Sequence, residues 1–390
     1  MSQQSFRELG VSPCVVDALA ARSIHDPFTI QARVLPDALA GLDVLAKSPT
    51  GSGKTLAFAI PIVERTEPRD PRPSALVLVP TRELAQQITD ELAAIARPKE
   101  LAVAAVYGGV PLRSQANRSR AAHVVVATPG RLQDLVERRL LDLGAVRMLV
   151  LDEADRMLDM GFKPQVDRIV KRLPANRQTM FFSATLDGEV GELAREYTSG
   201  ASRFEAELPR EQAPAEIEHR FVAVRPETKV ETLVEHLRNA NGLTLVFVRT
   251  KRGADALVRK LSGRGVRAVA MHGDLSQSAR QRALERFESS KVPVLVATDV
   301  AARGLDIDDI EHVVNYDPPE EEKGYVHRTG RTGRAGRNGT AITFVLPDQE
   351  AETSRVANRL GHRRQFEDAG LSTARPRLVY TSRRGRRSKW

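Results

Sequence analysis

Two short stretches of the sequence carry the residue types that phosphate chemistry needs. The first is SPTGSGKT (residues 48–55), which lies between the apolar DVLA and the helix-like LAFAIPIVE. This is the layout of a P-loop, in which backbone N–H groups at a helix N-terminus hold phosphates. Lys54 is expected to reach the β- and γ-phosphates and the Thr55 hydroxyl to bind Mg²⁺, although the motif starts with Ser48 instead of glycine. The alternative is a glycine-rich turn without a ligand. The other expected nucleotide contacts of the loop are Ser48, Thr50, Gly51, Ser52 and Gly53.

The second stretch, MLVLDEAD (residues 148–155), places carboxylates at the end of an apolar strand. Asp152 is expected to hold Mg²⁺ through its water shell, and Glu153 to orient or deprotonate an attacking water molecule. Acidic pairs also start helices, because carboxylates suit a helix N-terminus. The P-loop in the same chain favours the catalytic interpretation.

A third stretch, HRTGRTGRAGRNG (residues 327–339), repeats arginine and glycine at every third position. Four glycines are too short a period for collagen, which needs a long proline-rich tract. Sheet-like sequences on both sides, HVVNYD and TAITFVL, argue against a disordered Arg-Gly tail. We therefore predict an ordered segment with the spacing of a helical turn, which sets two arginines on one face.

The elements that position these residues follow one pattern. Short β-branched apolar runs alternate with helix-like stretches, which indicates parallel sheets in an α/β fold. The two halves also resemble each other: LVLVPTR matches LVFVRTK, VAAVYGG matches VRAVAMHGD, and VVVATPGR matches VLVATDVAARG, at offsets of 169, 165 and 170 residues. The sequence thus predicts two similar α/β lobes, residues 1–207 and 218–362, with a linker at 208–217 and a flexible basic tail at 363–390.

Composition is that of an ordinary soluble globular protein, with 41% hydrophobic and 28% charged residues. No apolar run is long enough to span a bilayer, and the first ten residues lack a secretory signal. The single cysteine excludes an internal disulfide, so we expect a cytoplasmic protein. Of the net charge of +9, residues 350–390 carry +7, from eleven Lys/Arg against four Asp/Glu. This basic end predicts a nucleic-acid partner, and a tail that only improves solubility is the alternative.

These motifs together resemble the DEAD-box ATP-dependent RNA helicases of superfamily 2, of bacterial type with a short basic tail. The resemblance covers nearly all of residues 1–350. Its motifs in the first half are the P-loop, PTRELA (80–85), GG (108–109), TPGR (128–131), DEAD (152–155) and SAT (183–185). In the second half they are VFVRT (246–250), HGDLSQSAR (272–280), ATDVAARGLD (297–306) and YVHRTGRTGR (325–334).

The resemblance implies two RecA-like domains that bind ATP and Mg²⁺. Gln31 would read the adenine edge, and Phe6 would be the upstream aromatic residue that supports it, or else a small-core anchor. This chain has PFTIQ where the family has Pro-Thr-Pro-Ile-Gln, so Phe28 and Thr29 replace the Thr-Pro pair and adenine selectivity is in question. Gly304 and Asp306 would also contact the nucleotide, and Arg331 and Arg334 would reach the γ-phosphate when the domains close.

The resemblance further implies sequence-independent contacts to the RNA backbone, with 2′-OH groups distinguishing RNA from DNA. The residues are Thr81, Arg82, Gly109, Thr128 and Arg131 in the first domain, and Gly273, Arg280, Thr298 and Asp299 in the second. Residues expected to couple the domains are Asp155, Ser183, Thr185, His327 and Arg328. We expect a monomer that unwinds short RNA duplexes or remodels ribonucleoproteins. An ATP-gated RNA clamp and a duplex-DNA translocase remain the alternatives.

Overall fold

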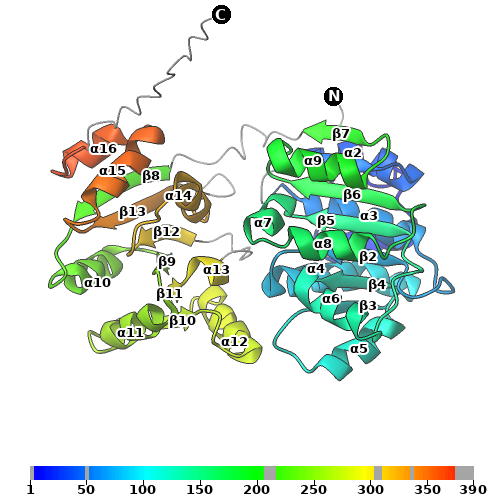
Figure 1. Ribbon diagram of the computed structural model, residues 1–390, viewed down its shortest axis with the longest axis horizontal. Helices are drawn as coiled ribbons and strands as arrows, with labels where there is room; N and C mark the ends of the chain where they lie inside the picture. The colour runs from blue at the N-terminus through cyan, green and yellow to red at the C-terminus, as the bar shows by residue number, and fades with distance from the viewer. Residues whose placement is uncertain (1–3, 49–51, 206–216, 303–309, 334–337, 374–390) are drawn as a thin grey trace, which may run out of the picture. The chain divides into compact units, whose positions relative to one another are not determined.

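The computed structural model describes residues 4–48, 52–205, 217–302, 310–333 and 338–373 (Figure 1). The chain divides into two compact units, and the division in the sequence falls between Ala213 and Pro214. Each unit is built around one parallel sheet flanked by helices, as the alternating pattern of the sequence predicts.

The first unit contains a seven-stranded parallel sheet with the strand order β3-β4-β2-β5-β6-β1-β7. Its strands are β1 (Val44–Lys47), β2 (Ala75–Leu78), β3 (Val103–Val106), β4 (Val124–Ala127), β5 (Met148–Asp152), β6 (Gln178–Ser183) and β7 (Ser202–Glu205). Its helices are α1 (Pro13–Ala20), α2 (Thr29–Ala40), α3 (Lys54–Arg65), α4 (Arg82–Ala96), the 3₁₀-helix η1 (Arg97–Lys99), α5 (Leu112–Ala121), α6 (Pro129–Glu137), α7 (Ala154–Asp159), α8 (Lys163–Val170) and α9 (Gly188–Tyr197).

Both faces of this sheet are covered by apolar side chains. Val77 and Val150 join a core formed with α1 to α4, whereas their neighbours Leu76 and Leu149 join a second core with α6, α8 and α9. Successive strand residues point to opposite faces, so a sheet buried on both sides needs continuous apolar strands. This is why the runs of Val, Leu and Ala in the sequence predicted these strands.

The second unit contains a six-stranded parallel sheet with the order β10-β11-β9-β12-β13-β8. Its strands are β8 (Ile217–Ala223), β9 (Leu243–Phe247), β10 (Ala268–Met271), β11 (Val294–Ala297), β12 (Ile310–Asn315) and β13 (Gly339–Val345). Its helices are α10 (Lys229–Asn239), α11 (Lys251–Ser262), α12 (Gln277–Glu288), α13 (Asp299–Ala302), α14 (Glu322–Thr329), α15 (Glu350–Arg359) and α16 (Arg363–Asp368).

The two sheets share one topology. The order β3-β4-β2-β5-β6 in the first unit corresponds strand for strand to β10-β11-β9-β12-β13 in the second. Even a helix cap recurs, because the Thr81 hydroxyl accepts the Leu84 N–H at 3.3 Å and the Thr250 hydroxyl accepts the Gly253 N–H at 2.9 Å. The internal repeat that the sequence offsets predicted is therefore a repeat of structure.

The edge strands β7 and β8 were missed by the sequence analysis. Both alternate between half-buried and exposed residues over most of their length. A search for continuous apolar runs passes over such strands, because an edge strand buries less of its surface than a central one. Strand β8 also begins at Ile217, the last residue of the segment expected to be a linker.

The helical spacing expected for the Arg-Gly stretch holds for residues 327–329, which lie in α14, and ends there in the described part. Helix α14 ends at Thr329, Gly330 follows as its C-cap, and Gly333 has a φ of 70°. A left-handed glycine cannot continue a right-handed helix, so the chain turns here. Residues 334–337, with Arg334, lie outside the described residues.

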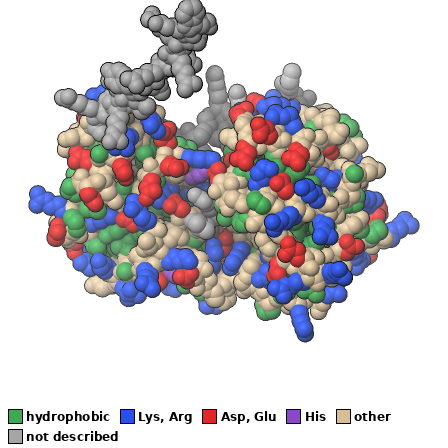
Figure 2. Space-filling model, in the orientation of Figure 1, with side chains coloured by type: hydrophobic (Ala, Val, Ile, Leu, Met, Phe, Trp, Pro, Cys, Tyr) green, Lys and Arg blue, Asp and Glu red, His purple; other side chains and the backbone are tan. Residues whose placement is uncertain are grey.

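Surface charge is mixed in both units. Figure 2 shows Lys and Arg side chains interspersed with Asp and Glu over the face that it draws. Among the described helices, none is long and apolar enough to cross a membrane.

The expected tail begins inside the fold. Residues 363–368 form α16, whose Phe366 is fully buried and packs edge-on against Phe221 of β8 at 5.2 Å between ring centroids. Just before this helix, the His362 ring stacks on His219 at 3.8 Å. The prediction of a flexible segment starting at residue 363 is therefore wrong for residues 363–373, because the buried Phe366 and Leu371 dock this stretch on the core.

Two truncations test this boundary. Removing residues 363–390 deletes the Phe366 anchor and should destabilise the second unit by about 3 kcal/mol, the typical cost of losing a buried phenylalanine. Removing only residues 374–390 should leave the unfolding transition unchanged. Both are measured by urea denaturation followed by circular dichroism, and equal losses in the two variants would contradict the assignment.

Candidate nucleotide-binding site and nucleic-acid interface

The candidate phosphate-binding residues meet at one edge of the first sheet. Lys54 follows β1, Asp152 ends β5 and Ser183 ends β6, which lies between the other two strands. All three strands are parallel, so their carboxyl ends lie on the same edge. Open parallel sheets bind ligands at this edge.

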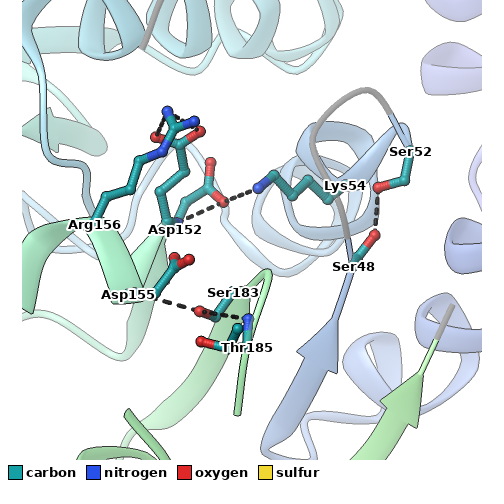
Figure 3. Close-up of polar contacts among 9 residues, drawn as sticks. Ser48, Ser52, Lys54, Asp152, Asp155, Arg156, Ser183 and Thr185 are labelled. Carbon is teal, nitrogen blue, oxygen red and sulfur yellow. Dashed lines mark hydrogen bonds and ion pairs between the residues drawn. The ribbon is translucent and has the colours of Figure 1, made fainter. Parts of the chain in front are cut away.

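The P-loop joins β1 to α3. Ser48 and Ser52 are buried and share a hydrogen bond between their hydroxyls (Figure 3). Gly53 has a φ of 80° and caps the helix, which places Lys54 at its first position. Thr55 is half-buried, and Thr50 and Gly51 lie outside the described residues.

Lys54 and Asp152 form a buried ion pair, with 3.4 Å between Nζ and Oδ1 (Figure 3). Burial by itself would lower the pKa of Lys54, but the carboxylates of Asp152 and Glu153 outweigh it and leave that pKa above its ordinary value. Burial also raises the pKa of Asp152, and Lys54 offsets only part of that effect. The lysine therefore stays charged and ready to bind a phosphate.

Glu153 is held in an unusual backbone conformation. Its φ is 52°, and its N–H donates to Oδ1 of Asp152 at 2.9 Å. Arg156 was not singled out by the sequence analysis, yet its Nη1 donates to both carboxylate oxygens of Glu153, at 3.0 and 2.8 Å. Both side chains are buried. The only signal in the sequence was an arginine three residues after a glutamate, which is a helical spacing.

Ser183 connects the carboxylate motif to the end of β6. Its hydroxyl accepts the Asp155 N–H at 3.3 Å and the Thr185 N–H at 3.4 Å (Figure 3). The first-unit residues expected to couple ATP to the second domain are thus joined to one another.

Gln31 lies directly beside the P-loop. Its Nε2 donates to the Gly53 carbonyl at 2.8 Å, and its Oε1 accepts the Phe28 N–H at 2.9 Å. Phe6, the upstream aromatic residue expected to support the adenine motif or else to anchor a small core, is only 1% exposed and belongs to the apolar core. Its burial favours the core-anchor alternative.

The five RNA-contact candidates of the first unit follow the adjacent strands β2, β3 and β4. Thr81 caps α4, so its hydroxyl already has a structural role. Arg82 lies across Gly108, where an added Cβ would be 2.9 Å from Nη2 of Arg82. Arg131 donates to the Val110 carbonyl at 2.8 Å. Gly109, with a φ of 88°, and Thr128, at the N-cap of α6, complete the set.

The second unit gathers its candidates at the equivalent edge. Gly273 follows β10, Thr298 follows β11, Asp299 begins α13, and Arg280 is buried in α12. Arg331 is also buried and His327 half-buried, whereas Gly304, Asp306 and Arg334 lie outside the described residues.

Arg328 is bound inside its own unit. It donates to the two Asp299 oxygens at 2.6 and 2.7 Å, to Asn315 Oδ1 at 3.2 Å and to the Asp317 carbonyl at 2.6 Å. Its side chain is 5% exposed, and it was expected to couple the two domains. In this structure it fixes Asp299, an expected RNA contact, and its coupling role stays a prediction.

A second buried cation supports the same edge, and the sequence analysis missed it. Lys229 forms an ion pair with Asp317 at 2.8 Å and lies 4.1 Å from the centroid of the Tyr316 ring. The other Asp317 oxygen accepts the Arg249 N–H at 2.9 Å. These residues are 88 and 68 positions from Asp317 in sequence, so local patterns gave no signal.

Comparison with known proteins identifies the family. Residues 28–193 match the DEAD/DEAH box helicase family, and residues 228–336 match the helicase conserved C-terminal domain. The DEAD-box ATP-dependent RNA helicase CshA of Bacillus licheniformis is 40% identical over 348 residues, which are 89% of this chain and 71% of that protein. The chain belongs to the DEAD-box ATP-dependent RNA helicases.

Solved structures agree with this assignment. Dbp5 of S. cerevisiae, bound to RNA and ADP BeF3, is 33% identical with a TM-score of 0.81, covering 92% of this chain and 94% of that one. The helicase Mss116, bound to ssRNA and UDP-BeF, is 27% identical with a TM-score of 0.77, covering 94% and 78%. The two sheets are thus the two RecA-like domains of an ATP-hydrolysing RNA helicase.

Replacing Arg328 tests its role in the helicase's second domain. Arg328→Ala leaves Asp299 and Asn315 without their shared donor, and should cost about 2–3 kcal/mol, since Asp299 is partly screened by solvent. Arg359→Ala is the control, because its pair with Glu322 on the same α14 is exposed and should contribute less than about 1 kcal/mol. Calorimetry measures both, and similar losses would contradict the buried role.

Proposed function

We propose that this helicase hydrolyses ATP at the edge formed by β1, β5 and β6. The supporting observation is the distance of 3.4 Å between Lys54 Nζ and Asp152 Oδ1, with Glu153 next in the chain. A buried cation and a buried carboxylate at a helix N-terminus suit a phosphate with a divalent cation.

Each residue of this edge has a proposed role. Lys54 binds the phosphates, while Thr55 and Asp152 hold Mg²⁺, which neutralises phosphate charge when it is bound. Among the described residues, no three His, Cys, Asp or Glu side chains form a metal site, so the ion would take its other ligands from phosphate and water. Glu153 orients or deprotonates the attacking water, and Arg156 fixes both of its oxygens.

The second domain is proposed to complete the reaction. Arg331 and Arg334 would stabilise charge on the γ-phosphate as arginine fingers do, and Gly304 and Asp306 would contact the nucleotide. Asp155, Ser183 and Thr185, joined by hydrogen bonds, would transmit the presence of the phosphate toward His327 and Arg328. The proposed enzyme is a cytoplasmic monomer.

RNA is proposed to bind along the ends of β2, β3 and β4 and the equivalent edge of the second domain. Hydroxyls, arginines and close backbone N–H groups suit phosphate contacts that do not read the bases. Since each ligand would favour the same closed arrangement of the domains, ATP and RNA should bind cooperatively. We propose local unwinding of short RNA duplexes or remodelling of ribonucleoproteins.

A strand-displacement assay distinguishes unwinding from an ATP-gated clamp. Short tailed RNA duplexes are mixed with the helicase and either ATP or a non-hydrolysable analogue, and released strand is measured over repeated turnovers. Unwinding predicts more strand displacement with ATP than with the analogue. Equal displacement with the two nucleotides, or none with either, would contradict the unwinding activity. Stimulation of ATP hydrolysis by duplex DNA as strongly as by RNA would favour a translocase.

Glu153→Gln tests the hydrolytic role. The amide keeps the size of the side chain but cannot accept a proton, so kcat should fall at least about 100-fold, the usual minimum for loss of a general base. Binding of ATP and RNA, measured by equilibrium titration, should persist. Glu189→Gln, at an exposed position in α9, serves as the control. Near-normal hydrolysis by Glu153→Gln would remove Glu153 from the mechanism.

The basic segment 374–390 is proposed as an additional RNA anchor, since it carries seven Lys/Arg and no Asp/Glu. Its deletion should raise the apparent KM for RNA about tenfold and reduce the slope of log KM against log salt, because fewer counterions are released. The ATPase rate at saturating RNA should change less than about twofold. An unchanged salt slope would show that the segment only improves solubility.

A further inference from the structure

The ring of Phe28 is placed against the P-loop. Phe28 is the N-cap of α2 and is 44% exposed, whereas none of the other eleven phenylalanines is exposed. A Cβ added to Gly53 would lie only 2.4 Å from Cδ2 of Phe28. The edge of an exposed aromatic ring thus touches the backbone of the phosphate-binding loop.

Gln31 links the same two residues. Its amide donates one hydrogen bond to the Gly53 carbonyl and accepts one from the Phe28 N–H. A carboxamide has two donors and two lone pairs, so only half of its capacity is left for a base. With 2% of its surface exposed, Gln31 presents little of that remainder to a ligand.

Phe6 offers no ring face to a ligand. It is 1% exposed and is among the largest fully buried side chains of the chain's described part. Moving it against a base would expose apolar surface and leave a cavity in the core, which costs several kcal/mol for a phenylalanine. A base bound near Gln31 therefore meets Phe28 more readily than Phe6.

We propose that Phe28, instead of Phe6, stacks on the base of the bound nucleotide in this helicase. This inference rests on the proposed function, because it takes the P-loop as the phosphate site. Stacking on an aromatic ring tolerates any base, since every base has a π-face. Base selectivity then depends on Gln31, and half of the hydrogen-bonding capacity of its amide is already used by Gly53 and Phe28. The site therefore accepts adenine with a modest preference over other bases.

Isothermal titration of the full chain with ADP and with GDP tests the proposal. Phe28→Ala should weaken both nucleotides about tenfold, within the range of alanine substitutions at stacked bases. The ratio of ADP to GDP affinity should stay constant. Phe28→Trp retains a ring and should restore binding.

Three controls separate stacking from other effects. Leu42→Ala changes an exposed apolar side chain before β1 and should bind ADP normally. Inhibition of ADP binding by pyrophosphate should be equal in the wild type and Phe28→Ala, because pyrophosphate occupies the P-loop without a base. Phe6→Leu keeps an apolar core residue and should bind ADP within about twofold of the wild type.

Several outcomes would overturn the proposal. Normal ADP binding by Phe28→Ala, or a loss confined to Phe6→Leu, would return the stacking role to Phe6. A parallel loss of pyrophosphate binding in Phe28→Ala would show that the ring only supports Gly53. If the wild type bound neither ADP nor pyrophosphate, the P-loop assignment itself would fail, and this result is distinct from the others.

Discussion

The buried ion pair between Lys54 and Asp152 is the constraint on which the first domain depends. A charged side chain removed from water is costly unless an opposite charge lies beside it. Here the lysine at the start of α3 and the carboxylate at the end of β5 meet across β6. The sheet must therefore keep β1, β6 and β5 adjacent and in register, which is what brings the phosphate loop to Glu153.

The second domain applies the same principle, with cations and carboxylates of the same origin. Its cations, Lys229 and Arg328, come from helices α10 and α14, and their partners Asp317 and Asp299 follow strands. In both domains, a helix cation reaches the carboxyl edge of a parallel sheet. The loops at that edge are fixed by electrostatics, which leaves their backbones positioned for ligands before any ligand arrives.

Strand positions could be predicted from sequence because burial on both faces demands apolar runs such as those of β2 and β4. The P-loop and the DEAD carboxylates were found because local spacing defines them. Long-range pairs such as Lys229 with Asp317 had no local signal, and neither had the contacts of Arg328 with Asp299 and Asn315. The tail boundary was misjudged because the basic residues that define the tail lie in 374–390, whereas Phe366 and Leu371 just before them are buried.

The edge strand β8 bears on the risk of aggregation at high protein concentration. An outer strand displays a row of unpaired backbone groups that a second chain could extend into an intermolecular sheet. In β8, the exposed positions include Glu218 and Arg220, which bind each other at 2.7 Å. A strand that paired with β8 would have to remove this ion pair from water. The alternation of exposed polar residues, which made β8 hard to predict from the sequence, therefore also disfavours aggregation through this edge.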